Sequence, residues 1–208
     1  MKGAADGHDT AKTIHASSRP SAQAGEETGM TLQELLTAAL QQLDRGTDAQ
    51  TLETWRDKLT RYLNDAIIDL TDMVRPRRTE QTEILRGTID LDALTRPCIK
   101  VTALRQGEKR LPFYYGAGTS LIHIPGAADG PATLTYRYMP PMLAADTDVP
   151  ELPEYSHGAL VTYAVARERA AGDAATAAQA GFQLYAQMRR ALRRHAGELD
   201  AYRFENIY

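Results

Sequence analysis

Hydrophobic residues recur at three- and four-residue steps along TLQELLTAALQQLDRG, which spans residues 31–46. This spacing places the apolar side chains on one stripe of a helix. Thr31 and Glu34 have the spacing of a capping box, in which each side chain bonds the other residue's backbone, and Gly46 is suited to ending the helix. The stripe consists of Leu32, Leu35, Leu36, Ala39, Leu40 and Leu43. The segment is therefore predicted to form a short amphipathic helix.

A longer helical pattern follows in TLETWRDKLTRYLNDAIIDLTDMVRP, residues 51–76. Asp48 or Thr51 is placed to cap its start, and Pro76 ends it because the residue before a proline avoids the helical region. The apolar positions are Leu52, Trp55, Leu59, Tyr62, Leu63, Ala66, Leu70, Met73 and Val74. Trp55 lies on this stripe and is predicted to anchor the core.

The pattern then changes, between about residues 80 and 139, to short β-branched and aromatic segments. Gly, Pro and Asp separate five such segments: EILRGTID, CIKVTAL, KRLPFYYG, TSLIHIP and ATLTYRYM. This arrangement predicts five or six antiparallel strands in a meander or small sandwich. IKVTAL and TLTYRY alternate, which indicates one solvent-exposed face for each strand, and DLDALTRP is read as a single helical turn.

Two alanine-rich helices are predicted after a proline-rich acidic connection. The first covers about residues 153–171, Gly172 ends it, and Asp173 caps the second, which runs to about His195. The short link between them favours antiparallel packing. The inward positions of the second helix are predicted to be Ala178, Phe182, Tyr185 and Leu192.

These patterns predict an α+β fold that is mainly α. An antiparallel bundle of about four helices, residues 31–196, is interrupted by a small antiparallel β lobe at about residues 80–139. Residues 1–30 lack an apolar period and are predicted to form a flexible N-terminal arm. Residues 197–208 form a C-terminal arm that carries several large apolar side chains and is predicted to dock on a partner.

Composition narrows the functional class. The chain has 208 residues, 43% of them hydrophobic, and a formal net charge of -3, which argues against a dedicated nucleic-acid binder. No apolar run approaches the roughly 20 residues that a membrane-spanning helix needs, and the polar N-terminus does not resemble a secretory signal. Because Cys98 is the only cysteine, an internal disulfide is excluded.

No motif predicts catalysis, a metal site or a cofactor. The histidines are His8, His15, His123, His157 and His195, and none forms a pair at metal-ligand spacing. YYGAGTS lacks the pattern of a phosphate-binding loop and is read as a hairpin turn, and no nucleophile-elbow motif occurs. The acidic residues of the connection, Asp146, Asp148, Glu151 and Glu154, are read as a solvated loop or as one that faces a basic partner.

Two groups of residues are candidates for binding a partner. Four-residue steps place four arginines on one helical face, which is suited to solvent, to an acidic protein or to phosphate: Arg189, Arg190, Arg193 and Arg194. The C-terminal AYRFENIY is suited to docking, because chain ends usually carry small polar residues. Its candidate partner-binding residues are Tyr202, Arg203, Phe204, Ile207 and Tyr208.

The ordered set of motifs from about residue 31 to 194 resembles the head–tail connector (adaptor) proteins of tailed bacteriophages. Five motifs carry the resemblance. They are an LN-A helix that ends in RP, a tyrosine-containing strand followed by a PP-L step, a D…P-LPE connection, a tyrosine-containing helix with A-RE that reaches GD, and a later helix with Phe. The matching residues are Leu63, Asn64, Ala66, Arg75 and Pro76; Tyr138, Pro140, Pro141 and Leu143; Asp148, Leu152, Pro153 and Glu154; Tyr163, Ala166, Arg167, Glu168, Gly172 and Asp173; and Phe182.

The resemblance implies a structural virion protein without catalytic residues. Such connectors form a ring of twelve copies beneath the portal, extend the DNA channel without reading its sequence, and receive the tail, stopper or neck protein. It implies a place in the virion neck after assembly in the host cytoplasm, and the portal as the partner of the C-terminal arm. The alternative from the residues alone is a non-viral cytosolic helical protein-binding module, and oligomeric state separates the two.

Overall fold

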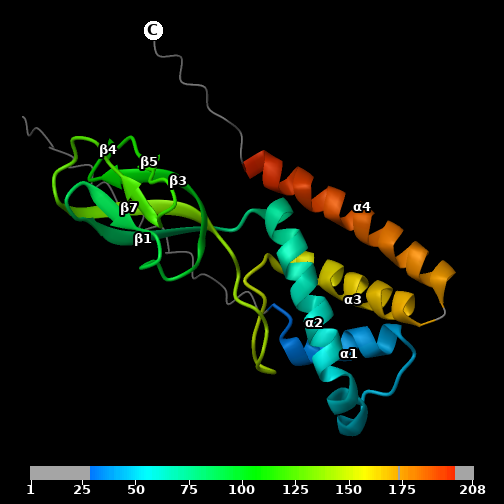
Figure 1. The fold of residues 1–208 in the computed structure, drawn as a ribbon. Helices are drawn as coiled ribbons and strands as arrows, with labels where there is room; N and C mark the ends of the chain where they lie inside the picture. The colour runs from blue at the N-terminus through cyan, green and yellow to red at the C-terminus, as the bar shows by residue number, and fades with distance from the viewer. Residues whose placement is uncertain (1–28, 173, 200–208) are drawn as a thin grey trace, which may run out of the picture.

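The computed structural model describes residues 29–172 and 174–199, and within them helices gather at one end and strands at the other (Figure 1). The helices are α1 (Leu32–Gln42), α2 (Ala49–Val74), α3 (His157–Ala171) and α4 (Ala175–Leu199). The strands are β1 (Arg77–Ile84), β2 (Thr88–Asp90), β3 (Cys98–Gln106), β4 (Lys109–Arg110), β5 (Tyr114–Tyr115), β6 (Leu121–His123) and β7 (Gly130–Tyr138). The predicted α+β class is confirmed.

The first two helices begin at the predicted caps. The backbone N–H of Glu34 donates to Oγ1 of Thr31 at 3.3 Å, and the Thr31 N–H donates to the Glu34 carboxylate at 2.8 Å, which completes the capping box. Asp48 caps α2. The prediction for Gly46 is wrong: α1 ends at Gln42, and the left-handed residue that follows is Asp44, with φ of 56°.

The helices share one apolar core, in which α3 contacts α1, α2 and α4. Leu59 and Leu63 of α2 are fully buried in it. Trp55 is only partly buried, at the rim of this core, and the guanidinium carbon of Arg45 lies 3.7 Å from the centroid of its ring. The prediction that Trp55 anchors the core is therefore wrong, because fully buried leucines fill the centre.

The C-terminal helices differ from prediction at their ends. A 3-10 turn, Glu154–Ser156, precedes α3, so the α-helix begins at His157 rather than near residue 153. α4 continues to Leu199, which takes residues 197–199 of the predicted C-terminal arm into the helix. A Cβ atom added at Gly181 of α4 would lie 2.9 Å from the Cβ of Ala166 of α3, so small residues allow these helices to approach closely.

The strands form two antiparallel sheets, ordered β1-β7-β3-β4 and β2-β6-β5. The described residues contain seven strands, beginning at Arg77 rather than near residue 80, and residues 91–96 form turns rather than a helix. Of the two predicted strand arrangements, the meander is wrong, because β7 lies between β1 and β3. YYGAGTS links β5 to β6 as the predicted hairpin.

Both sheets contribute to a second apolar cluster, separate from the helical core. In β7 the burial alternates along the strand, so Leu134 and Tyr136 are fully buried while Thr133 and Thr135 face outward. In β3 the register shifts between Val101 and Ala103, which interrupts the predicted alternation. The β lobe thus keeps one sheet face polar and solvent-exposed.

Candidate interaction surfaces and the joint that positions them

Residues 139–153, which lead from β7 back to the helices, are attached to α2 by two of its side chains, Asn64 and Arg56. The Asn64 amide nitrogen donates to the Leu143 carbonyl at 3.0 Å, and its amide oxygen accepts from the Leu143 N–H at 2.8 Å. The side chain thus imitates a strand partner for one residue of the connection. Arg56 adds a second attachment on α2 by pairing with Asp146 and donating to the Ala144 carbonyl.

The same connection caps the start of α1. The Leu32 and Gln33 N–H groups donate to the Asp148 and Asp146 carbonyls at 2.7 and 3.1 Å, which satisfies amides that a helix start leaves without partners. The Asp148 carboxylate accepts two backbone N–H bonds at 2.8 Å from Ala144 and Ala145, and these bonds lower its pKa. Residues 30–33, 139–153 and α2 are therefore one connected joint.

His157 closes this joint from α3. Its Nδ1 accepts from the Met30 N–H at 3.1 Å and its Nε2 donates to the Leu152 carbonyl at 3.2 Å, a pair that requires the neutral ring with the proton on Nε2. The residue is 1% exposed, and burial lowers the pKa of His157, against the smaller opposing influence of the Leu152 hydrogen bond and of Glu154. The position of His157 near a helix start suggested an interface residue, and the sequence could not indicate these two bonds because both partners are backbone groups.

We expect the free energy of unfolding to fall as pH drops below about 6.5 and before the carboxylates titrate. Because the pKa of His157 is lowered in the folded state, the unfolded state binds more protons in this range, so protonation favours unfolding. The contribution of neutral His157 to stability is fully present above the pKa of the unfolded state, which is about 6.5. Urea denaturation of the wild type and of His157→Gln, between about pH 7 and 5, measures how the free energy of unfolding of each protein changes with pH. Equal pH slopes for the two proteins would contradict the assignment.

The β lobe is tied to this joint by an ion pair. Arg96, in the turn after β2, contacts both carboxylate oxygens of Glu151, and this contact lowers the pKa of Glu151. The Tyr138 N–H also donates to the Pro76 carbonyl at 3.3 Å, where the chain enters the lobe. The interpretation of the acidic connection as solvated or partner-facing is therefore wrong for Asp148 and Glu151, which are partly buried and bond within the chain. Asp146 and Glu154 are exposed as predicted, although Asp146 also pairs with Arg56.

The candidate basic residues of α4 do not share one environment. The Arg189 guanidinium lies 3.1 Å from Asp69 of α2, which also accepts a 2.5 Å bond from the Tyr185 hydroxyl. Burial and the Asp69 carboxylate raise the pKa of Tyr185. Arg190 is exposed. The side chains of Arg193 and Arg194 lie outside the described part of the chain, as do Tyr202, Arg203, Phe204, Ile207, Tyr208 and residues 1–28.

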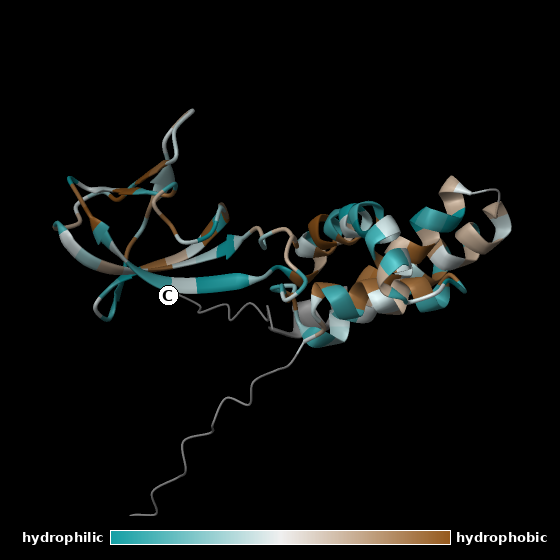
Figure 2. Cartoon of the chain, turned by 90° about the horizontal axis from the view of Figure 1, so that it is seen from below, coloured by the Kyte–Doolittle hydropathy of each residue, from teal (hydrophilic) through white to brown (hydrophobic). Residues whose placement is uncertain are grey.

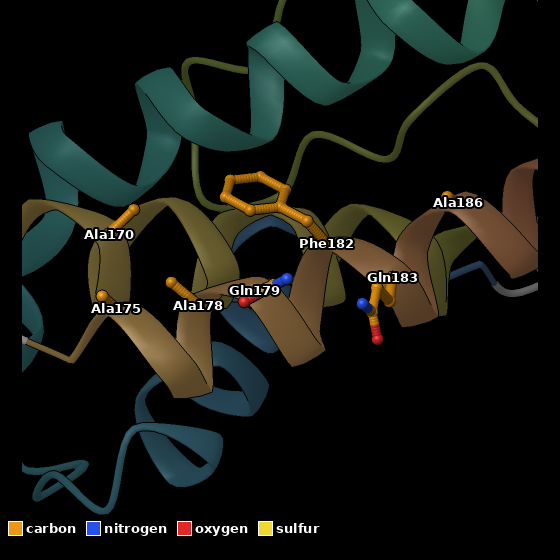
Figure 3. A pocket seen from close by; sticks show the side chains of 7 residues that line it. All are labelled: Ala170, Ala175, Ala178, Gln179, Phe182, Gln183 and Ala186. Atoms are coloured by element: carbon orange, nitrogen blue, oxygen red, sulfur yellow. The ribbon is translucent and has the colours of Figure 1, made fainter.

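Two exposed features were missed by sequence reasoning. Tyr114 and Tyr115 of β5 are 57% and 49% exposed, and Tyr114 stacks on His123 of β6 with 5.1 Å between ring centroids. The aromatic run in KRLPFYYG was their signal. A groove of about 540 Å³ lies along α3 and α4, lined by four alanines, Phe182 and two glutamines (Figure 3). It has no sequence signal beyond alanine content, because both helices contribute to it.

Neither a metal-binding cluster nor a membrane-spanning helix is found in the part of the chain that the structure describes. No group of three or more His, Cys, Asp or Glu side chains that could hold a metal occurs within residues 29–172 and 174–199. In the same part of the chain, no helix has both the length and the apolar character to cross a membrane. Partial burial raises the pKa of Cys98, which disfavours its reactive thiolate form.

The family model of the SU10 adaptor protein matches residues 30–203. The chain belongs to this family. The match begins where Met30 bonds His157 and includes every helix and strand described above. No curated protein matches the chain.

Membership makes the protein a phage head–tail adaptor, a structural virion component that associates with other virion proteins. Several motif residues that carry the resemblance build the joint. Asn64 holds the PP-L step at Leu143, Asp148 closes the turn before α1, and Glu168 is buried against α2. These three motif residues therefore stabilise the contacts between the connection and the helices.

Proposed function

We propose that this adaptor forms a ring of twelve copies beneath the portal, extends the DNA channel and receives the tail, stopper or neck protein. The observation that carries the proposal is the adaptor family match, which covers residues 30–203. The ring stays in the virion neck and assembles in the host cytoplasm. DNA passes through it without sequence-specific binding, and no cofactor takes part.

In this proposal the chain divides into a helical bundle, residues 31–196, and a β lobe inserted at about residues 80–139. The two separate apolar clusters support this division, because each part has a core of its own. The joint at Asn64 and the Arg96–Glu151 pair hold the lobe at a defined position relative to the bundle. The bundle forms the ring, and the lobe and the arms meet neighbouring proteins.

The C-terminal arm docks on the portal through Tyr202, Arg203, Phe204, Ile207 and Tyr208. Burying its four large apolar side chains would yield roughly 6–12 kcal/mol, at about 1.5–3 kcal/mol each. Ordering about eight residues would cost roughly 8–16 kcal/mol of backbone entropy. Since these values nearly cancel, backbone hydrogen bonds to the portal, as in strand addition, stabilise the docked arm, and the ring multiplies the effect through effective concentration. Arg190, Arg193 and Arg194, with Arg189, form the basic surface of α4 for the channel or a partner.

Deleting residues 202–208 is expected to abolish capture by portal rings in a pull-down while leaving the melting temperature of the free subunit unchanged. The reason is that the arm contacts the portal rather than its own helices. Deleting residues 2–8 removes an equal length from the other end and serves as the control. A destabilised subunit that still binds portal would reject the docking role. Electron microscopy of the wild-type complex tests the ring directly, and a monomeric adaptor on the portal would refute it.

A further inference from the structure

The groove along α3 and α4 lies on a stretch of α4 without charged residues. Besides Phe182, its lining consists of small or neutral side chains: Ala170, Ala175, Ala178, Ala186, Gln179 and Gln183 (Figure 3). Leu184 of the same helix is 50% exposed. The sequence from Ala174 to Met188 contains no Asp, Glu, Lys or Arg, although charged residues make up 25% of the chain. The groove is therefore an exposed face that is both apolar and neutral.

A second exposed face with little charge lies on α1. The sequence of residues 35–43 is LLTAALQQL, and Glu34 is the only charged residue of the helix. The Glu34 carboxylate accepts hydrogen bonds from the backbone N–H and the hydroxyl of Thr31 in the capping box. The outward side chains line a shallow depression on the helix: Met30, Gln33, Glu34, Thr37, Ala38 and Gln41. This face thus presents neutral amides and small side chains.

These two faces differ from the exposed face of α2, which carries both signs of charge: Glu53, Asp57, Arg61 and Asp72. In Figure 2 the strongest hydrophobic colour lies toward the middle of the helical end, where the core is. A helix face that stays in water normally carries charges, whereas the buried centre of a protein interface is depleted of them. The reason is that a buried charge loses its hydration, which costs far more than burying a neutral side chain. The faces of α1 and α4 therefore have the composition of surfaces that become covered.

The two faces lie on different sides of α3, which contacts both α1 and α4 and lies between them (Figure 1). A ring of more than two copies needs such an arrangement, because each copy meets its two neighbours through two different surfaces. The lengths also match. α1 has 11 residues, and the groove follows α4 from Ala175 to Ala186, so each extends about 16 Å at 1.5 Å per residue.

We propose that the groove along α3 and α4 binds α1 of a neighbouring copy, so that this contact joins the copies of the ring. The inference rests on the proposed function, which supplies the ring. Phe182 is the apolar anchor of the contact, and Gln179 and Gln183 face the glutamines of the neighbouring α1. The rival occupant is the segment of residues 200–208. Three of its nine residues are charged and would lose hydration in the groove, so the neutral α1 fits it better.

The test places charges on the two faces of the full-length chain and follows ring completion on portal rings by electron microscopy. Q179E/Q183E puts negative charge into the groove and is expected to raise the adaptor concentration that completes the ring at least about tenfold. Q33K/Q41K, on α1, should raise it in the same way. The chain that carries all four substitutions should return to within about threefold of the wild type, because every contact then joins opposite charges.

The matched control is A117E/A128E, which adds two negative charges at exposed turns of the β lobe. It should complete the ring within about threefold of the wild-type concentration. Melting temperatures show whether each variant is folded. If Q179E/Q183E melts early, Q179K/Q183K replaces it, and glutamates at the two α1 positions then provide the opposite charge.

Three outcomes would overturn the inference. Q179E/Q183E completes the ring at the wild-type concentration, or the chain with all four substitutions stays as defective as Q179E/Q183E, or an equimolar mixture of Q179E/Q183E and Q179K/Q183K restores assembly. The last result would assign the groove to α4 of the second copy. Wild-type rings that form together with unaffected variants reject only this contact. A wild-type chain that forms no ring on portal rejects the proposed function, and this contact with it.

Discussion

Replacing Asn64 with alanine is expected to lower the free energy of unfolding by about 2–4 kcal/mol. The substitution removes two hydrogen bonds and leaves both the N–H and the carbonyl of Leu143 without their partner in a partly buried place. Removing one partner costs the desolvation of the group that remains, which exceeds the net value of the bond itself. Urea denaturation at neutral pH measures the change.

Asp72→Ala, an exposed substitution on the same helix, is the matched control and should change stability by less than about 0.5 kcal/mol. Adaptor function should follow the same order, because a loosened joint moves the β lobe relative to the helices. A loss below about 1 kcal/mol for Asn64→Ala would mean that residues 139–153 are held by other contacts. It would also remove the structural explanation of the LN-A motif.

Replacing Lys58 with methionine is expected to cost about 2–3 kcal/mol. Lys58 Nζ lies 2.6 Å from the Glu168 carboxylate, whose side chain is only 8% exposed, while Arg45 is 3.8 Å away. Breaking a buried ion pair costs about 3–5 kcal/mol because the remaining charge is left uncompensated. The value here is lower because Arg45 remains and the lysine side chain is itself 38% exposed. Chemical denaturation measures the loss.

The double variant Lys58→Met, Glu168→Gln separates the charge from the packing. Neutralising Glu168 removes the buried uncompensated carboxylate, so the double variant should recover at least about half of the lost stability. Lys58→Arg is the conservative control, since it keeps the positive charge. If the double variant is less stable than Lys58→Met alone, then the charge of Glu168 stabilises the fold even without Lys58, and an uncompensated buried carboxylate is not the cause of the loss.

The local features of the fold could be predicted from sequence because they depend on neighbouring residues. Thr31 and Glu34 form the predicted capping box, Asp48 caps α2, and α2 ends immediately before Arg75 and Pro76. Each of these signals operates within about four residues. The change of periodicity predicted the strand-rich segment, because alternation is also a property of neighbouring residues. The first strand nevertheless begins at Arg77, a few residues before the predicted start.

The ordered motifs also indicated the adaptor family before any contact was known. That inference depended on the order of motifs along the chain, and a family match over residues 30–203 confirms it. The role of the matching residues was not predictable in the same way. Asn64 looked like one polar position on a helix, and Asp148 like part of a solvated acidic loop.

Tertiary structure decided the joint and the surfaces, because their partners are distant in sequence. Asn64 bonds a residue 79 positions away, Tyr185 bonds Asp69 across 116 positions, and Met30 bonds His157 across 127 positions. The groove along α3 and α4 exists only because these two helices pack against each other. The sequence by itself thus determined the helices, their caps and the family. Strand order, helix packing and long-range hydrogen bonds decided which residues meet, because those depend on the packing of the whole chain.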